Sequence, residues 1–577
     1  MTIAPPPPAP DRVPCGPTAG RAVTTAGRAD GVPGGRAGVA QSRGRAGGRA
    51  VLRARRLVAH ATRRPWAITA VLCCVVLLLP LSGPDLAAQE FRTWLFRSHG
   101  ALLWDNQWYG GHLLPGYSLL FPPLASMVGT RVLGAIACTW AAAMATALLG
   151  GRRADRGQRL ASVWFAVALV GQLVIGQLPF AVGFALALTA LVGANRDRPW
   201  LAALTALAAS LASPLAGSFL LMAGLAWLSQ AGLRRVAPLG LAAVGVLLGA
   251  LLGGGGEFPF PAISLFTVLL FAGGGLALAP SLPKSLRWGL LLYGMSSIAL
   301  FAVPNPAGGN AARLGALVGG PLAALAFGRT GRWRPLAVTA VPLLLWQMWP
   351  VGTAVAHSVD DPSNHADYYV GLQTFLRTQN AQLGRLEVPT LRQHWEASYL
   401  APVFPLARGW ERQVDIRYNG ALYDPALTGD GLHQWALDSG VSLFALPDAP
   451  LDPWATREAE LISAGQPWLQ PVWHDEHWQV WAVSDAPGLV TGPGELSHLG
   501  VNSASVRFAS AGTVVLRVHW SRYWQVVHGP ACVGHTWDGW LSVTSAEPGE
   551  VSLAALWSLD RMTGVDNECA ASPGEGS

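Results

Sequence analysis

Charged side chains are scarce in this sequence. Asp, Glu, Lys and Arg account for 13% of the 577 residues, whereas hydrophobic residues account for 51%. Globular proteins in water carry about 25% charged residues, so this composition fits a chain of which about half is embedded in lipid. The sequence also lacks a P-loop, a dinucleotide-binding glycine pattern and a Gly-x-Ser-x-Gly turn, and these absences argue against cytosolic nucleotide chemistry.

Acidic residues and histidine are missing from the long apolar stretches. A bilayer-crossing helix needs roughly 17–25 apolar residues, and eleven stretches between Trp66 and Val351 fall in or near that window. They comprise residues 66–83, 131–150, 160–176, 178–194, 199–213, 215–232, 236–253, 262–280, 286–303, 311–328 and 335–351. Ion-coupled transporters need carboxylates or histidines inside the membrane. Their absence disfavours ion-coupled transport. It also predicts that any catalytic residues lie at the outer rim of the helices.

The loops between these stretches alternate in charge. Loops after the second, fourth, sixth, eighth and tenth stretches carry Lys or Arg, whereas the intervening loops at 176–177, 213–214, 253–261 and 304–310 carry neither. Basic loops remain on the cytoplasmic side of a membrane. The sequence therefore predicts a multi-pass plasma-membrane protein with a cytoplasmic N-terminus and an extracellular C-terminal region that begins after residue 351.

The N-terminal tail, residues 1–64, is rich in Arg, Pro, Gly and Ala and has no hydrophobic periodicity, which predicts disorder. We expect its arginines to contact anionic membrane lipids and to hold the N-terminus inside. A nucleic-acid partner is not expected. No small-residue cleavage site follows the first apolar stretch, so within a transmembrane domain spanning 65–351 this stretch is interpreted as an anchor.

The C-terminal region contains only short apolar runs separated by turn residues. Strand and helix patterns alternate over 352–486, which predicts a small α/β domain. Short alternating strands over 487–563 predict a β-sandwich, followed by a disordered tail at 564–577. Cys532 and Cys569 are the only cysteines of this region, where a disulfide would persist, although the sequence leaves open whether they meet.

The first exterior loop, residues 84–116, contains the main candidates for chemistry. Leu86, Phe91 and Leu95 recur at helical spacing, which predicts an amphipathic helix lying in the membrane interface. One carboxylate, Asp85, stands at the point where the first apolar stretch leaves the membrane.

This order of parts resembles the GT-C superfamily of membrane glycosyltransferases, whose members have many spans, a large first exterior loop with an acidic residue, and a C-terminal exterior domain. The resemblance covers residues 66–577 and implies transfer of a sugar from a polyprenyl-phosphate carrier to an acceptor outside the cytoplasm. Many members have a paired acidic motif in this loop, whereas here Leu86, Ala87 and Ala88 follow Asp85. The sequence therefore specifies no cofactor and leaves a divalent cation open.

Asp85 is the predicted catalytic base, because an acceptor hydroxyl loses its proton as it attacks the sugar and a carboxylate can accept that proton. An equally good interpretation is that Asp85 caps the helix that begins after it, and the two roles are compatible. Asp105 and His112 are accessory candidates in the same loop, although turn and surface roles also suit them. Glu257, in the loop GGGGEFPFP, is a candidate second acid.

The departing lipid phosphate needs cations or backbone donors at the outer surface. Residues 305–313 place a glycine-containing loop before a helix with Arg313 near its start, an arrangement that favours anions. Arg313 and Asn310 are therefore the predicted phosphate ligands, and Arg92 and Arg97 are second candidates. Arg313 could instead extend to lipid head groups.

The His- and Asp-rich run 357–367 lacks the two-His helical spacing of zinc enzymes, so no metal ligands are assigned. The sequence thus predicts a GT-C-like bundle of about eleven spans with an exterior α/β domain and β-sandwich. Its expected activity is transfer of a hexosyl or pentosyl group to a cell-envelope glycan or lipid. The alternative is a non-enzymatic scaffold or an exporter of lipid-linked glycans, which a neutral helix bundle suits equally well. An enzyme requires Asp85 and a phosphate-binding cation at one cavity.

Overall fold

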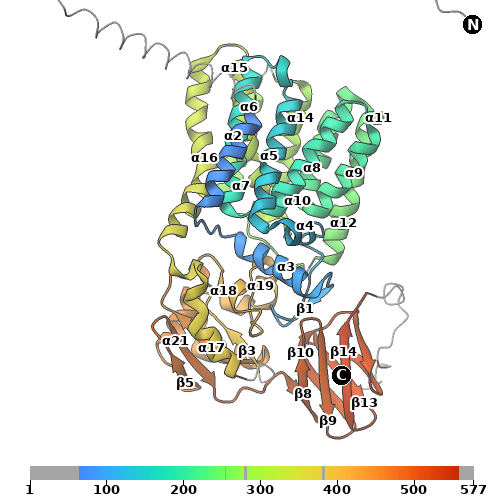
Figure 1. Cartoon of the computed structure of the whole chain (residues 1–577), viewed down its shortest axis with the longest axis vertical. Helices are drawn as coiled ribbons and strands as arrows, with labels where there is room; N and C mark the ends of the chain where they lie inside the picture. The colour runs from blue at the N-terminus through green and yellow to red at the C-terminus, as the bar shows by residue number, and fades with distance from the viewer. Residues whose placement is uncertain (1–63, 254, 279–281, 380–383, 558–568, 570–577) are drawn as a thin grey trace, which may run out of the picture. The chain divides into compact units, whose positions relative to one another are not determined.

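The computed structural model describes residues 64–253, 255–278, 282–379, 384–557 and 569. The chain divides into two units, Met1–Val58 and Ala59–Ser577, and every described residue belongs to the second. Within this unit, apolar helices come first in the sequence and most of the strands come last (Figure 1). The predicted tails at 1–64 and 564–577 lie outside the described residues, apart from Arg64 and Cys569.

Eight helical stretches are long and apolar enough to cross a membrane, among the residues that the structure describes. They are α5 (Thr130–Leu148), α6 with α7 (Arg156–Ala168, Val170–Ile175), α8 (Leu178–Asn195), α10 (Pro214–Ala231), α11 with η2 and α12 (Leu233–Val236, Ala237–Leu241, Ala242–Leu252), α14 (Lys284–Ala302), η3 with α15 (Gly308–Ala311, Ala312–Gly328) and α16 (Trp333–Val359). Three shorter apolar helices occupy the remaining predicted stretches, namely α2 (Pro65–Leu78), α9 (Pro199–Ala212) and α13 (Ala262–Leu278). This pattern indicates a multi-pass membrane protein.

The end of α2 differs from the predicted stretch 66–83, because the helix stops at Leu78. Pro80 follows closely, and a proline disfavours helical backbone in the residue before it. Leu79 accordingly adopts an extended conformation (φ −95°, ψ 143°). The chain therefore leaves α2 as an irregular segment several residues before Asp85.

The end of α16 also differs, since the helix continues to Val359 instead of ending at residue 351. The last turn of α16 is hydrogen-bonded to the segment after α2. Ser358 Oγ accepts a hydrogen bond from Ser82 N and donates one to Ser82 O, both at 3.0 Å. Residue 352, the predicted start of the α/β domain, thus lies inside a helix.

Helices α8, α9 and α10 pack through small side chains. A cluster of alanines from α8 and α9 is buried between them: Ala187, Ala190, Ala202, Ala206 and Ala209. A Cβ at Gly183 would come within 2.9 Å of the Cβ atoms of Ser213 and Ala216. The glycine therefore lets α8 approach the start of α10, as small residues do between membrane helices.

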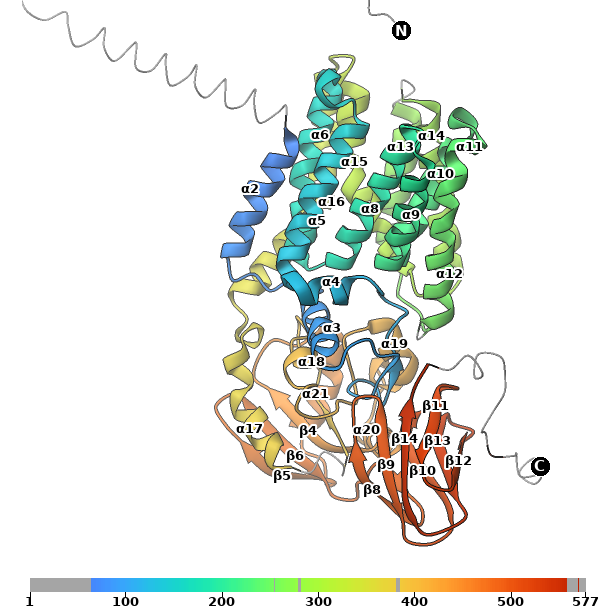
Figure 2. The same cartoon turned by 45° about the vertical axis from the view of Figure 1, so that its right-hand side comes forward.

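Helix α3 (Leu86–His99) opens the segment between α2 and α5, and β1 (Trp104–Asp105), β2 (His112–Leu113) and α4 (Phe121–Val128) follow it. The predicted amphipathic helix is present, but its apolar face packs against protein. Phe91 is fully buried, and its ring stacks on that of Trp108 with centroids 4.3 Å apart. Helix α3 contacts α4 and α5 on one side and α18 (Glu396–Tyr399) on the other, so it lies between the apolar helices and the strand-containing regions (Figure 2).

A mixed four-stranded sheet and short helices form the α/β region, residues 360–486 without 380–383. Its strand order is β3-β4-β6-β5, with β3 parallel to β4 and the other pairs antiparallel. The elements are α17 (Val370–Thr378), β3 (Arg385–Glu387), α18, α19 (Arg412–Tyr418), α20 (Gly429–Asp438), β4 (Val441–Pro447), α21 (Thr456–Ser463), β5 (Leu469–His474) and β6 (Trp478–Val483). Strand β4 is buried along most of its length, as a central strand covered on both faces is.

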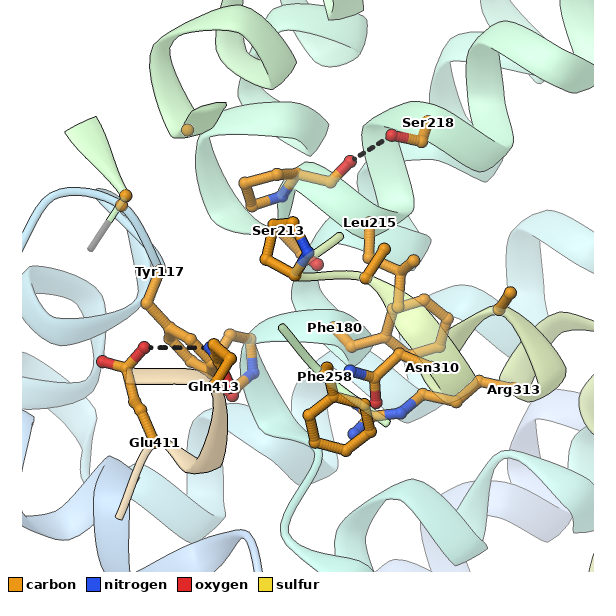
Figure 3. A pocket seen from close by; sticks show the side chains of 18 of the residues that line it. Tyr117, Phe180, Ser213, Leu215, Ser218, Phe258, Asn310, Arg313, Glu411 and Gln413 are labelled. Atoms are coloured by element: carbon orange, nitrogen blue, oxygen red, sulfur yellow. Dashed lines mark hydrogen bonds between the residues drawn. The ribbon is translucent and has the colours of Figure 1, made fainter. Parts of the chain in front are cut away.

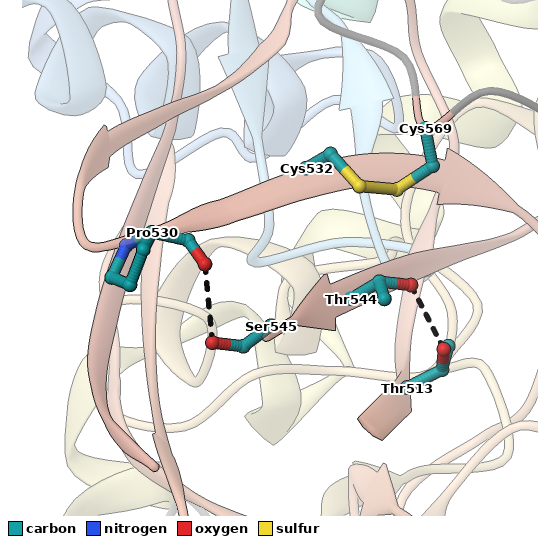
Figure 4. Close-up of a disulfide and its surroundings, with 6 residues drawn as sticks. All are labelled: Thr513, Pro530, Cys532, Thr544, Ser545 and Cys569. Atoms are coloured by element: carbon teal, nitrogen blue, oxygen red, sulfur yellow. Dashed lines mark hydrogen bonds between the residues drawn. A yellow bond between two sulfur atoms is a disulfide. The ribbon is translucent and has the colours of Figure 1, made fainter. Parts of the chain in front are cut away.

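Two four-stranded antiparallel sheets form the two-sheet region, residues 487–557, with orders β12-β13-β10-β7 and β11-β14-β9-β8. The strands are β7 (Val490–Thr491), β8 (Gly494–Leu499), β9 (Ser503–Phe508), β10 (Gly512–His519), β11 (Trp524–His528), β12 (Ala531–His535), β13 (Trp540–Ser545) and β14 (Gly549–Ala555). Alternate side chains of both sheets share one hydrophobic core, as in a sandwich. Cys532 of β12 forms a disulfide with Cys569, with Cα atoms 5.1 Å apart (Figure 4).

The β1–β2 hairpin is bonded into both strand-containing regions. Asn106 N donates to Val501 O at 2.7 Å in the two-sheet region, and Gln107 O accepts from Leu406 N at 2.8 Å in the α/β region. Trp104 also enters the core of the two-sheet region. The segment after α2 therefore belongs structurally to the regions that end the chain.

Candidate functional site

Asp85 is positioned by the close approach of two backbone segments. Helix α7 ends at Ile175, and the next residue, Gly176, adopts the left-handed conformation (φ 91°). Asp85 N donates a hydrogen bond to Ile175 O at 3.1 Å. A Cβ on Gly176 would come within 2.5 Å of Leu86 N, and a Cβ on Gly83 within 2.3 Å of Ile175 O. Only glycine permits this approach, and it fixes Asp85 at the start of α3.

The carboxylate of Asp85 makes an ion pair with Arg313. Asp85 Oδ2 lies 3.3 Å from Arg313 Nη2, and both side chains are largely buried. Helix α3 does begin directly after Asp85, yet the side chain makes no capping hydrogen bond with it. The carboxylate of Asp85 therefore pairs with Arg313 and does not cap α3.

The loop before α15 is held in shape by side chains that sequence analysis did not single out. Asn305 Oδ1 accepts hydrogen bonds from Ala307 N and Gly308 N at 3.0 and 2.8 Å. Tyr293 of α14 donates through its hydroxyl to Ala311 O at 2.9 Å. These bonds fix the turn that presents Asn310 and the first turn of α15.

Asp85, Asn310 and Arg313 line one cavity of about 830 Å³. Asn310 and Arg313 lie on one side of the view in Figure 3, and Tyr117 and Glu411 lie on the other. The cavity is thus formed jointly by the start of α3, the loop before α15 and the α/β region. It is large enough for a sugar and a phosphate, since ligand pockets commonly measure about 300–1,000 Å³.

The part of the cavity between the helices is apolar. Its walls come from α10, α12 and α14, with side chains that include Leu221, Met222, Leu225, Val246, Ala250 and Leu292. Leu225 lines the cavity and is 62% exposed, so this apolar arm reaches the outer surface of the helices. The cavity therefore combines charged side chains with an apolar arm lined by helix residues.

No protein-family model matches the chain, and no curated protein matches it.

The α/β region adds charged side chains to this cavity that the sequence could not connect with Asp85. Arg392, His394, Arg412 and Asp452 all line it. The only signal was the density of polar and aromatic residues over 394–419, which carries no information about distance from Asp85. His394 has a left-handed backbone (φ 57°), which is uncommon outside glycine.

Asp85 and His394 are among the titratable groups of the cavity whose pKa values are shifted. Burial raises the pKa of Asp85, and the charges of Arg313 and His394 oppose this rise without cancelling it. Burial would lower the pKa of His394, but its contacts with Asp452 (3.3 Å) and Glu396 (3.5 Å) outweigh burial and raise the pKa to about 9. At neutral pH the cavity thus holds a protonated His394 and a carboxylate that is more basic than an exposed aspartate.

Arg92, a second candidate for phosphate binding, does not line the cavity. It is buried, pairs with Glu411, and lies over the ring of Tyr117 at 4.0 Å from the centroid. Both of these partners do line the cavity, so Arg92 supports the wall from behind. Arg97 is exposed and donates to Ser126 O at 3.3 Å.

The accessory candidates are not brought to the cavity either. Burial raises the pKa of Asp105 to about 7 and, together with the charge of Arg92, lowers the pKa of His112 to about 3. The nearest atoms of the two side chains, Asp105 Oδ2 and His112 Nδ1, are 3.9 Å apart inside the β1–β2 hairpin. Glu257 is exposed on its loop.

Among the described residues, no three His, Cys, Asp or Glu side chains are grouped as metal ligands would be. Within the run 357–367, Asp361 pairs with Arg392 at 3.1 Å and caps the short helix η4 (Pro362–Asn364) through Ser363 N. These contacts give Asp361 a structural role next to the cavity.

Proposed function

We propose that this chain is a membrane glycosyltransferase that transfers a sugar from a polyprenyl-phosphate donor to an extracytoplasmic glycan or lipid of the cell envelope. The observation that carries the proposal is the single cavity that contains Asp85, Arg313 and an apolar arm open to the helix surface. A donor with a charged head and a long hydrocarbon chain matches both ends of this cavity. The architecture proposed with it is GT-C-like, with about eleven spans and the α/β and two-sheet regions outside the cytoplasm.

In this reaction the acceptor hydroxyl oxygen bonds to the anomeric carbon of the sugar while the bond from that carbon to the phosphate oxygen breaks. The electron pair of the broken bond leaves with the phosphate, and the hydroxyl proton passes to Asp85. The outcome is inversion at the anomeric carbon. The raised pKa of Asp85 supports this role, since a base works best when its pKa is close to the working pH.

Arg313 is placed to respond to the charge that develops on the phosphate. Its guanidinium has five N–H donors, and Asp85 is its ion-pair partner in the described structure. The remaining donors, with the side-chain amide of Asn310, would hold the phosphate as it departs. The pair also keeps Asp85 ionised until the acceptor arrives, because a nearby cation favours the carboxylate form.

The proposal is tested with membranes that contain the wild type, Asp85→Asn or a control, Asp448→Asn. Asp448 is an exposed aspartate of the α/β region that pairs with His477 and lies outside the cavity lining. Radiolabelled polyprenyl-phosphate sugars and envelope glycans would be supplied, with and without a chelator to test for a divalent cation. We expect transfer by the wild type and the control, and a loss of about 100-fold or more in Asp85→Asn.

Equal transfer by Asp85→Asn would remove Asp85 from the mechanism. Absence of transfer by all three proteins across a broad panel would contradict the enzymatic proposal. It would favour the scaffold or exporter of lipid-linked glycans, since the apolar arm suits a bound lipid in either case. Thermal unfolding of each purified protein shows whether a loss of transfer reflects a loss of folded protein.

A further inference from the structure

Of the three described arginines that line the cavity, Arg313 and Arg412 come from different parts of the fold. Arg313 belongs to α15, and Arg412 is the first residue of α19 in the α/β region. Their side chains are 23% and 25% exposed, whereas their carboxylate partners Asp85 and Asp452 are 13% and 8% exposed. Each arginine thus lines the cavity, keeps part of its side chain exposed and is paired with a more deeply buried carboxylate.

Asp452 forms an ion pair with Arg412 and orients its side chain. Its Oδ1 accepts a hydrogen bond from Trp454 N at 3.0 Å, and its Oδ2 contacts both Arg412 Nη2 and His394 Nε2. The other ring nitrogen of His394 lies 3.5 Å from Glu396 Oε1. Both ring nitrogens of His394 thus lie close to carboxylates of the protein.

The backbone conformation of His394 is a second observation that points to a functional role for this cluster. A left-handed conformation is unfavourable in a residue with a side chain and persists where the surroundings enforce it. His394 takes that conformation (φ 57°), and its side chain contacts Asp452, far along the sequence. Strain of this kind gathers at functional sites.

We propose that Arg313 and Arg412 form a two-sided clamp for a lipid-linked phosphate, with Asp452 and His394 as positioning residues that hold Arg412. An arginine binds phosphate through paired N–H donors, and two arginines can engage separate oxygen atoms of one group. The apolar arm between α10, α12 and α14 then takes the hydrocarbon chain of the same molecule. The identity of the lipid as a sugar donor rests on the proposed function, whereas phosphate binding by the clamp does not.

The clamp is tested by binding of a fluorescent polyprenyl phosphate to the purified full-length protein in lipid nanodiscs. The variants are Arg313→Gln, Arg412→Gln and Asp452→Asn, and the matched control is Arg507→Gln, an arginine 68% exposed on β9. Each clamp variant is expected to bind the lipid phosphate about 10-fold to 100-fold more weakly, the usual effect of losing a charge-assisted hydrogen bond. The control is expected to bind like the wild type.

Two further ligands show whether the protein recognises the phosphate group and whether that phosphate must be attached to a lipid. The corresponding polyprenol, which has no phosphate, is expected to bind all variants equally, and this also shows that the apolar arm is still folded. Inorganic phosphate at the same concentration is expected to leave the lipid phosphate bound. Equal competition by inorganic phosphate would overturn the lipid assignment.

The clamp is refuted if Arg412→Gln binds the lipid phosphate within about twofold of the wild type, or if the wild type binds the phosphate and the polyprenol alike. Asp452→Asn should lose affinity for the phosphate and keep its affinity for the polyprenol; an equal loss for both would reduce Asp452 to a purely structural residue and contradict its positioning role. Phosphate-dependent binding without sugar transfer would support the clamp and contradict the proposed glycosyltransferase activity. Sugar transfer by Arg412→Gln with an unchanged donor KM would support the enzymatic activity and contradict the clamp.

Discussion

Replacing His394 with asparagine removes a charge that two carboxylates stabilise in the folded protein. Contacts with Asp452 and Glu396 raise the pKa of His394 from 6.5 to about 9 against the opposing effect of burial. At about 1.4 kcal/mol per pH unit, this difference corresponds to about 3 kcal/mol of folding free energy. Two other charged groups adjoin the cluster, since Arg412 shares Asp452 and the charge of His394 acts on Asp85.

The direction of the pH dependence follows from the raised pKa. Below 6.5 the histidine is protonated in both the folded and the unfolded chain, so the stabilisation is fully present. As the pH rises toward and through about 9, the folded protein loses the proton and the stabilisation disappears. The wild type should therefore be more stable than His394→Asn at neutral pH, and the two should converge well above pH 9.

Thermal unfolding followed by intrinsic fluorescence measures this difference, because the chain contains 25 Trp. For a unit of about 100–200 residues, 1 kcal/mol changes the unfolding temperature by roughly 2–8 °C. A loss of about 3 kcal/mol should therefore lower the unfolding temperature of the α/β region by roughly 6–24 °C in His394→Asn at neutral pH. His477→Asn, which alters an exposed histidine paired with Asp448, is the control. Equal unfolding temperatures at neutral pH, or a difference that persists unchanged well above pH 9, would refute an electrostatic role.

Three other predictions concern the site and its support. Transfer by the wild type should fall as the pH drops through the raised pKa of Asp85, because a protonated carboxyl cannot accept the acceptor proton; initial rates across the acid range check this, and a rate independent of pH would contradict it. Gly83→Ala should abolish transfer while the protein still reaches the membrane, because the new Cβ would overlap Ile175 O; activity of the wild-type level would show that the segment can shift freely. Cys532→Ser should destabilise the two-sheet region by about 3–4 kcal/mol, since the disulfide closes a separation of 37 residues; limited proteolysis with and without reductant measures this, and equal cleavage of variant and wild type would contradict it.

Much of the fold could be predicted because hydrophobic pattern is a local property. The length and apolar character of α8 and α14 mark them in the sequence, and alternation marks β10 and β13. The same pattern could not say what covers an apolar face. The face of α3 that contains Phe91 was therefore expected in the membrane interface, whereas in the structure it packs against Trp108.

The site could be predicted only in part, for a related reason. Asp85 and Arg313 were each recognisable from their neighbours in the sequence, and the structure brings them into an ion pair. His394 and Arg412 reach the same cavity through folding of the α/β region, and their separation in the sequence from Asp85 hides this. Asp105 and His112 have the right residue types for chemistry, yet neither lines the cavity.

The β1–β2 hairpin has a consequence for how the protein is made. Asn106 Nδ2 donates to Gly500 O across 394 residues of sequence. At a synthesis rate of about 5–20 residues per second, this partner is synthesised roughly 20–80 s after the hairpin. During that interval Trp104 and Trp108 have been translated without the two-sheet and α/β regions that bury them. Insertion of the helices can therefore be complete while the α/β region that closes the cavity has not yet been synthesised, and the hairpin waits longer still for its partners in the two-sheet region.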